Sequence, residues 1–416
     1  MKPPRSLRAL LAFVLVFGLG IVLSNVFSSA NPNDEWPQWL GPNRDGISTA
    51  TGLLKSWPES GPKILWRIPL GDGYGGIVVA QGRALTMFSQ GDDEFLICLE
   101  AANGKEIWRV RMDSTFKDTN GNGPRSTPTI DNGIVYALGG RGQFMAVQLK
   151  DGKKIWGHDV RREFNSFGPS DGGFATSPLI EGEKLLLEAG GARHAFMAFD
   201  KKAGKVLWHV ESDSSAFSSP VAINFNGTRQ IVFFSALGGV ALAPENGKVY
   251  WRMPWIMSYN VNAATPLFIP PDRIFLSSGY DVGAVMLRMR PQGNAITTEK
   301  LWRSKSFQNI WATSIVRGEF MYGFDKGTLK CINLNTAEEK WAQRGFGTGA
   351  LLFADGHLIV LGDKGKLALV EATPGAYTEK ASAQILEGRS LTLPALARGK
   401  LFVRNAKEMV CVDLVN

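Results

Sequence analysis

The stretch NGKEIW, residues 103–108, combines a Gly-Lys turn with a tryptophan that follows shortly after it. The same combination returns as DGKKIW at 151–156, GKVLW at 204–208 and NGKVYW at 246–251. Glycine in such a turn can adopt a positive φ, which tight hairpins require. Tryptophan is large enough to pack between neighbouring sheets. A recurring turn with a recurring aromatic indicates one structural unit that is repeated along the chain.

Tryptophans mark this repeat over most of the chain, at intervals of about 40–50 residues. Each interval holds a Ser/Thr-Pro segment such as 126–130, an alternating apolar segment such as 134–138, a Gly-rich turn, and a third apolar segment before the Gly-Lys turn. Alternation with β-branched and aromatic residues predicts strands rather than helices. The seven markers are Trp66, Trp108, Trp156, Trp208, Trp251, Trp302 and Trp341.

Four short strands in each repeat predict an all-β fold, an eight-bladed β-propeller of four-stranded antiparallel blades with tryptophan-docking repeats. Six blades end at the markers from Trp108 to Trp341, and a seventh covers 349–386 with Ile385 in place of the tryptophan. The eighth blade has only three strands before the chain ends. We therefore expect the strand around Trp66 to complete it and to lie beside Cys411, which leaves no open sheet edge.

The first residues of the chain stand outside the repeat. Three basic residues precede an apolar run at about 10–23, and small residues follow at 28–30, as in a secretory signal peptide. The run is short for a membrane span, which takes ~20 apolar residues, and an uncleaved inner-membrane anchor is the alternative. Either segment predicts export to the periplasm. The predicted division is 1–30 signal peptide or anchor, 31–62 leader, and 63–416 propeller.

Composition narrows the class of protein further. With 44% hydrophobic and 20% charged residues, the chain is that of a globular protein with a core. The net charge of +8 comes largely from lysines in the repeated turns, so we expect no nucleic-acid partner. Three cysteines, an odd number, argue against a disulfide framework. Cys98, Cys331 and Cys411 share one position of the third strand, so we expect small buried side chains there, with a reactive thiol as the alternative.

The repeat CLEAANGKEIW at 98–108 resembles that of pyrroloquinoline-quinone-type propellers, and its Gly and Trp match the tryptophan-docking pattern of that family. The resemblance covers about residues 60–416. The stretch WPQWLGPNRDG at 36–46 resembles the leader found before such propellers in exported bacterial proteins. The family includes quinoprotein dehydrogenases, which hold the quinone and Ca²⁺ above the ring centre. It also includes scaffold members that bind protein partners, such as the propeller lipoprotein of the outer-membrane barrel-assembly machinery.

Two features of this chain separate it from many of the dehydrogenases. Those enzymes often carry a vicinal disulfide formed by adjacent cysteines, and this sequence has no adjacent pair. The sequence also lacks a C-x-x-C-H haem motif. The resemblance therefore implies the fold more firmly than it implies an activity.

Ligands usually bind propellers at the channel mouth, where the blade-connecting loops gather. Arg125, Asn262 and Arg389 come directly before innermost strands, so we expect them nearest the channel. An arginine cluster suits an anionic ligand. The alternative is that these side chains only bond neighbouring loops. Further candidates on this face are Asp171, His194, Asp281 and Arg404.

Several loops are expected to wall the mouth. Those after Arg109 and Gly157 are long, and loops above ~12–15 residues are often functional. The segment 251–262 adds aromatic residues. GDGYGG at 71–76 fits G-x-G-x-x-G, but a strand follows it, so it is interpreted as a blade-connecting loop. DTNGNG at 118–123 begins like a calcium loop without its final glutamate, and no His/Cys spacing predicts zinc.

The sequence contains no recognisable catalytic set, so we expect an exported, monomeric, non-catalytic binding or scaffold module. Its partner would be an envelope protein or a small anionic ligand. The alternative is a dehydrogenase that uses pyrroloquinoline quinone with Ca²⁺ to oxidise an alcohol or sugar, with roles for Asp171, Asn262, Asp281 and Arg389. A third interpretation is a hydrolase or lyase that uses channel carboxylates. Fold alone does not decide between them.

Overall fold

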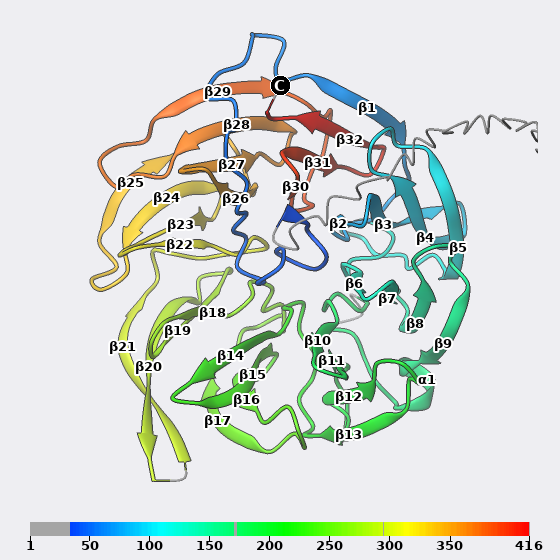
Figure 1. Cartoon of the computed structure of the whole chain (residues 1–416). Coiled ribbons are helices and arrows are strands. Elements are labelled where there is room, and N and C mark those ends of the chain that lie inside the picture. Colours follow the sequence, from blue (N-terminus) through cyan, green and yellow to red (C-terminus); the bar gives the residue numbers. More distant parts are fainter. Residues whose placement is uncertain (1–33, 170–172, 294, 416) are drawn as a thin grey trace, which may run out of the picture. The chain divides into compact units, whose positions relative to one another are not determined.

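The computed structural model describes residues 34–169, 173–293 and 295–415. Within them the chain is nearly all β, with one short helix, α1 (Val160–Glu163). The strands form eight four-stranded antiparallel sheets, which confirms the predicted eight-bladed β-propeller (Figure 1). The predicted signal peptide or anchor, 1–30, lies outside the described residues.

In the described part of the chain, no helix is both long enough and apolar enough to cross a bilayer.

The first four blades follow one another along the chain, and each runs from an innermost to an outermost strand. Blade 1 is β2 (Val78–Ala80), β3 (Arg83–Gln90), β4 (Asp93–Glu100) and β5 (Glu106–Ser114). Blade 2 is β6 (Thr129–Asp131), β7 (Ile134–Leu138), β8 (Gln143–Gln148) and β9 (Lys154–Asp159). Blade 3 is β10 (Leu179–Glu181), β11 (Lys184–Glu188), β12 (Phe196–Asp200) and β13 (Val206–Val210). Blade 4 is β14 (Val221–Phe225), β15 (Thr228–Ser235), β16 (Gly238–Leu242) and β17 (Val249–Pro254).

The remaining blades repeat this order until the last. Blade 5 is β18 (Leu267–Ile269), β19 (Arg273–Ser278), β20 (Gly283–Gln292) and β21 (Ala295–Ser304). Blade 6 is β22 (Ile315–Arg317), β23 (Phe320–Asp325), β24 (Thr328–Asn333) and β25 (Glu339–Gln343). Blade 7 is β26 (Ala350–Ala354), β27 (His357–Leu361), β28 (Lys366–Glu371) and β29 (Glu379–Gln384). Blade 8 is β30 (Ala395–Ala397), β31 (Lys400–Arg404), β32 (Glu408–Asp413) and β1 (Ile64–Pro69).

Blade 8 joins the two ends of the described chain. Strand β1 pairs antiparallel with β32, and Trp66 lies opposite Cys411, as predicted. All three cysteines are buried and free, and each lies opposite a marker tryptophan on the neighbouring strand. Closing the ring in this way satisfies the backbone groups that an unpaired edge strand would expose.

The recurring turn and tryptophan lock neighbouring blades together at the outer edge of the ring. Trp108 donates its indole N–H to the Leu149 carbonyl of the next blade at 2.9 Å. Gly152, in that blade's Gly-Lys turn, has a φ of +72°, and a Cβ there would lie 2.8 Å from the Trp108 ring. Only glycine fits this close approach without strain. Trp66, Trp156 and Trp208 contact the corresponding glycines in the same way.

Blade 7 departs from this pattern, and one prediction about it was wrong. The residue that takes the tryptophan position is Ala381, which lies opposite Leu369 beside the β-bulge shared by the other blades. Ile385 follows the strand instead. Trp57 of the leader and Ala381 both pack against the hydrophobic cluster that joins blades 7, 8 and 1.

The Ser/Thr-Pro segments form a second interlocking ring around the channel. The N–H of Gly76 donates to the Thr127 hydroxyl at 2.8 Å, Thr127 donates its N–H to Ser177 at 3.0 Å, and Ser177 donates to Ser219 at 2.9 Å. Each hydroxyl thus accepts from the blade before it. This explains why a hydroxyl residue recurs at the start of the innermost strands.

The leader does not lie apart from the ring but enters its channel. Trp36 forms a β-bridge with Val79 of β2, and Ile47 forms one with Phe353 of β26, so the segment 36–48 spans the channel between blades 1 and 7. This segment, here called the plug, crosses the centre of the ring in blue (Figure 1). It enters from the face of the first-to-second strand turns, where the Gln81 N–H donates to Glu35. We call the opposite face, with the blade-connecting loops, the mouth.

Arg44 fixes the plug in the channel. Its guanidinium donates to the carbonyls of Pro220 at 2.6 Å, Pro178 at 2.7 Å and Ser177 at 3.2 Å, and to the Gln38 side chain at 3.1 Å. The residue is only 3% exposed. Burial lowers the pKa of Arg44 to about 9, so the side chain stays protonated at neutral pH. These contacts hold the plug inside the channel.

Candidate functional site

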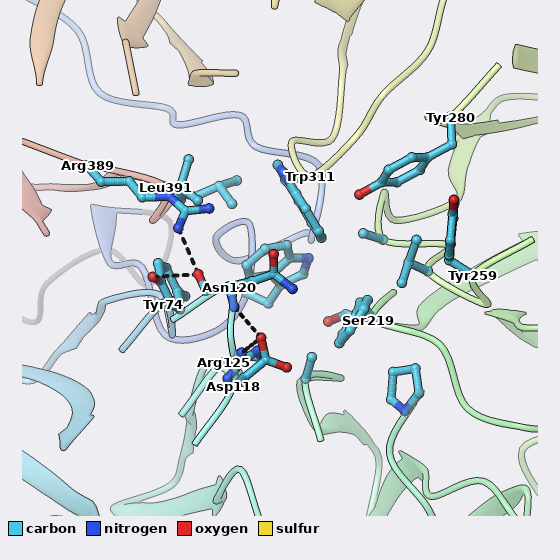
Figure 2. A pocket seen from close by; sticks show the side chains of 17 residues that line it. Tyr74, Asp118, Asn120, Arg125, Ser219, Tyr259, Tyr280, Trp311, Arg389 and Leu391 are labelled. Atoms are coloured by element: carbon cyan, nitrogen blue, oxygen red, sulfur yellow. Dashed lines mark hydrogen bonds and ion pairs between the residues drawn. The ribbon is translucent and has the colours of Figure 1, made fainter. Parts of the chain in front are cut away.

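A pocket of about 430 Å³ opens at the mouth, directly above the plug (Figure 2). This volume lies within the range of small-ligand sites, ≈ 300–1,000 Å³. The floor includes Trp39 of the plug, whose indole N–H donates to the Thr265 hydroxyl at 2.8 Å. The lining residues are Trp39, Tyr74, Asp118, Asn120, Arg125, Pro169, Ala175, Phe217, Ser219, Tyr259, Val261, Ala263, Tyr280, Trp311, Arg389, Leu391 and Leu393.

One side of the pocket is an aromatic wall. The rings of Tyr259 and Tyr280 lie 5.4 Å apart, and Phe217 contacts Trp311 at 6.3 Å between ring centres. Figure 2 shows Tyr259 and Tyr280 on the opposite side from Tyr74 and Arg389. Tyr280 has a φ of +56°, a left-handed conformation that is rare for bulky side chains. Such strain persists where the surrounding structure imposes it and concentrates at functional sites.

The other side of the pocket is cationic. Arg389 donates one N–H to the Asn120 carbonyl at 2.7 Å and lies over the Tyr74 ring at 5.6 Å. Its side chain is otherwise exposed, and within the described residues no other acceptor contacts it. A guanidinium has five N–H donors in a fixed fork. Arg389 therefore retains donors for an anion in the pocket.

Arg125 lies on the same side but is occupied by its own loop. Its guanidinium donates to the carbonyls of Gly121 at 2.9 Å and Gly123 at 2.8 Å, and lies 3.6 Å from the Asp118 carboxylate. Burial lowers the pKa of Arg125, partly offset by Asp118. Asp118 also accepts from the Asn120 N–H at 2.6 Å. Arg125 thus shapes the loop on which Arg389 rests.

Buried carboxylates hold two other mouth loops. Glu94 accepts from the N–H groups of Phe116 and Gly140, both at 3.0 Å. Glu188 accepts from the Ala216 N–H at 2.8 Å, and its second oxygen has no partner. Burial raises the pKa of Glu94, and it raises the pKa of Glu188 well above the usual range. These carboxylates lie behind the loops and do not line the pocket.

Two predicted site residues are structural, because their polar groups are already bonded inside the fold. Asn262 is fully buried, donates to the Ser235 carbonyl at 2.8 Å and accepts from the Ser278 hydroxyl at 2.6 Å. Arg404 is also fully buried and donates to backbone carbonyls including that of Met87. Asn262, expected nearest the channel, and Arg404, expected on the mouth face, therefore do not line the pocket.

The remaining predicted residues lie at the edge of the mouth or beyond it. Asp281 is exposed and pairs with Lys326, next to Tyr280 of the pocket wall. His194 is half-buried and stacks on His209 at 4.2 Å between ring centres, and it does not line the pocket. Asp171 lies outside the described residues. The structure thus brings Arg125 and Arg389 together at the pocket, and it places Asn262, Arg404, Asp281 and His194 outside the lining.

Sequence reasoning missed most of the aromatic lining. Trp39 and Trp311 are tryptophans outside the repeat markers, and that departure from the period was a signal that could have identified them. The described lining contains no histidine, cysteine or lysine, and its one carboxylate, Asp118, is committed to the loop. Across the described residues, no cluster of three or more His, Cys, Asp or Glu side chains could hold a metal ion. The arrangement is suited to binding by stacking and by charge-assisted hydrogen bonds.

Sequence comparison relates the chain to two groups of proteins. Quinoprotein alcohol dehydrogenase PedH of Pseudomonas putida is 28% identical over 170 residues, which cover 38% of this chain and 27% of PedH. The chain thus spans about a quarter of the length of that enzyme. Outer membrane protein assembly factor BamB of Shewanella oneidensis is 21% identical over 298 residues, which cover 67% of this chain and 71% of that protein.

Solved structures share the fold at low sequence identity. The BamB structure from Moraxella catarrhalis matches with a TM-score of 0.58 and 12% identity, over 79% of this chain and 96% of that one. Quinohemoprotein alcohol dehydrogenase ADHIIG from Pseudomonas putida HK5 matches with a TM-score of 0.60 and 10% identity, over 92% of this chain and 80% of that one. The family model described as outer membrane protein assembly factor BamB matches residues 58–170 and 167–343. The chain therefore belongs to this BamB family of PQQ-like propellers.

Proposed function

We propose that the chain is an exported, non-catalytic scaffold that binds another envelope protein at the mouth of its channel. The observation that carries this proposal is the pocket itself, an aromatic wall facing an arginine with unused donors. Tyrosine, tryptophan and arginine dominate the energetics of protein interfaces. The BamB relatives, named as outer membrane protein assembly factors, support an envelope partner, and the N-terminal sequence pattern supports export.

The quinone-dependent alternative does not fit the described residues as well. The pocket would accommodate a flat anionic ring system against Trp39, with Arg389 beside it. The Ca²⁺ that accompanies the quinone in that family takes six to eight oxygen ligands, including carboxylates. The described lining supplies one carboxylate, and Asp118 already bonds Asn120 and faces Arg125.

Site-specific photo-crosslinking in the native host tests the proposal. A benzophenone amino acid replaces Tyr280 at the mouth, or Ile155 on the outermost strand β9, which is also exposed (39%). We expect discrete crosslinked adducts from the mouth position and none from the outer position. Adducts from both positions alike, or from neither, would contradict a protein-binding mouth.

Calorimetric titration with pyrroloquinoline quinone, with and without Ca²⁺, tests the alternative on the same purified protein. We expect no Ca²⁺-dependent heat. Tight, Ca²⁺-dependent binding that Arg389→Gln abolishes would move the conclusion to a dehydrogenase.

A further inference from the structure

The mouth carries an exposed apolar rim next to the pocket. Its five members are Phe167 (54% exposed), Leu237 (47%), Ile256 (70%), Tyr259 (60%) and Tyr280 (46%). All five lie on loops of the mouth, between β9 and β10, β15 and β16, β17 and β18, or β19 and β20. The other large apolar side chains with comparable exposure in the described chain, Ile64, Ile155 and Leu207, lie on outermost strands.

Backbone contacts show that the rim is continuous. Ser215 donates its hydroxyl to the Phe167 carbonyl at 2.6 Å, and the Ala236 N–H donates to Ser214 at 3.1 Å, which brings Phe167 and Leu237 to one junction. The Trp255 N–H donates to the Leu237 carbonyl at 3.0 Å, so Leu237 lies beside Ile256. Tyr259 then contacts Tyr280 and borders the pocket.

Three of the five rim members, Phe167, Leu237 and Ile256, do not line the pocket, so a small ligand inside the pocket would leave them uncovered. Contiguous exposed apolar side chains of this kind mark protein interaction surfaces. The shape also matters, because one concave pocket beside a rim suits a partner that inserts a single large side chain. Both features favour a polypeptide over a small solute.

The charge of the pocket lining indicates which polar group a partner would place there. Arg389 faces the aromatic wall across the pocket and retains guanidinium donors that no described residue accepts. Arg125 adds positive charge behind it, and Asp118 is the single carboxylate of the described lining. A carboxylate is the group that a guanidinium fork binds best.

From this juxtaposition we infer that the mouth recognises an acidic segment of a partner protein. In that segment, an aromatic or large aliphatic side chain fills the pocket and a neighbouring carboxylate bonds Arg389. The inference rests on the proposed function and specifies the chemistry of the partner.

A random 12-residue peptide library displayed on phage tests this chemistry with the full-length purified protein. We expect enriched peptides to carry Asp or Glu beside Phe, Trp or Leu. Arg389→Gln should abolish this enrichment. Arg344→Gln, which removes an equally exposed arginine of a mouth loop outside the pocket, should not. Neutral or basic winners, or no winners, would overturn the inference.

Fluorescence anisotropy with one enriched peptide then locates the two contacts. When the acidic residues of the peptide are replaced with Gln, its affinity for the wild-type protein should fall about tenfold, within the range of a charge-assisted contact. The same replacement should leave the affinity of the peptide for the Arg389→Gln variant unchanged. Replacing its apolar anchor with Ser should matter less in Tyr280→Asn than in wild type. An acidic preference that persists in Arg389→Gln, or falls equally in Arg344→Gln, would overturn the inference.

The experiments can reject the scaffold function and the acidic-segment inference independently of each other. Mouth-specific photo-crosslinks to a partner, together with a library that shows no acidic preference, would retain the scaffold function and reject the acidic segment. Absent crosslinks would reject the scaffold function itself.

Discussion

Arg44 lies inside the channel and Arg389 at its mouth, and the surroundings of these two arginines differ. Arg44 is buried in the plug and donates to four acceptors, whereas Arg389 is exposed at the mouth and donates to one. A guanidinium whose donors are satisfied by the protein stabilises the fold. One with unused donors beside a pocket is available to a ligand. Residue type alone therefore does not identify a binding group, but the number of donors left unsatisfied does.

The buried arginine gives the largest expected effect. Arg44→Met removes the guanidinium donors to the buried carbonyls of Pro220 and Pro178, of which Pro178 keeps the Thr129 hydroxyl as a donor. We expect a loss of about 3–5 kcal/mol in the free energy of unfolding, since several hydrogen bonds to a charged group are lost together. Urea denaturation measures this. A loss under about 1 kcal/mol would show that the plug does not depend on Arg44.

The second prediction concerns a buried carboxylate behind the mouth loops. Unfolded, Glu188 ionises near pH ~4.3, whereas burial raises the pKa of Glu188 in the folded protein. Stability is therefore unaffected below the unfolded pKa and falls as pH rises above it, by up to about 1.4 kcal/mol per pH unit until the folded carboxyl ionises.

Glu188→Gln cannot ionise and removes this dependence. We expect the free energy of unfolding of this variant to exceed that of the wild type by about 1–3 kcal/mol at pH 8, and we expect the difference to shrink towards pH 4.5. Unfolding curves at the two pH values provide the measurement. A difference that is independent of pH would show that Glu188 does not titrate in this way.

The third prediction separates strain from packing at the mouth. Tyr280 of the pocket wall has a left-handed backbone conformation, which costs roughly 1–2 kcal/mol for most residues and less for asparagine. We expect Tyr280→Asn to stay within about 1 kcal/mol of wild-type stability, because relief of strain offsets the lost ring contact. The matched control, Tyr322→Asn, removes a buried tyrosine and should cost about 3 kcal/mol or more. Equal losses in the two variants would make Tyr280 an ordinary packing residue.

The smallest expected effect completes the comparison of the two arginines. Arg389→Gln should change the free energy of unfolding by no more than about 0.5 kcal/mol, since the side chain is exposed and makes one hydrogen bond. Denaturation measured in parallel with Arg44→Met makes the test direct. A loss approaching that of Arg44→Met would show that both arginines serve the fold alone.

The fold could be predicted because most blades reuse the same packing contacts. The docking tryptophan recurs in seven blades and its turn glycine in four, and hydroxyl residues recur at the channel, so the period is visible in the sequence. The pairing of Trp66 with Cys411 followed from counting strands. Blade 7 was misread at one position, because Ala381 gives no aromatic signal.

The pocket could be predicted only in part, because its residues follow no period. Arg125 and Arg389 were found from their place before innermost strands. Asn262 shares that place, but its side-chain amide bonds Ser235 and Ser278 inside the fold instead. The tryptophans that break the period lie in the leader and the mouth loops. They are Trp36, Trp39, Trp57, Trp255 and Trp311.

The joining of β1 to β32 also sets an order of events in time. Trp66 is synthesised early, yet its partner strand is complete only at Asp413, near the other end of the chain. At ≈ 5–20 residues per second, the wait lasts on the order of tens of seconds. During that interval the earliest strand has no hydrogen-bonding partner, and the ring stays open until the last few residues are made.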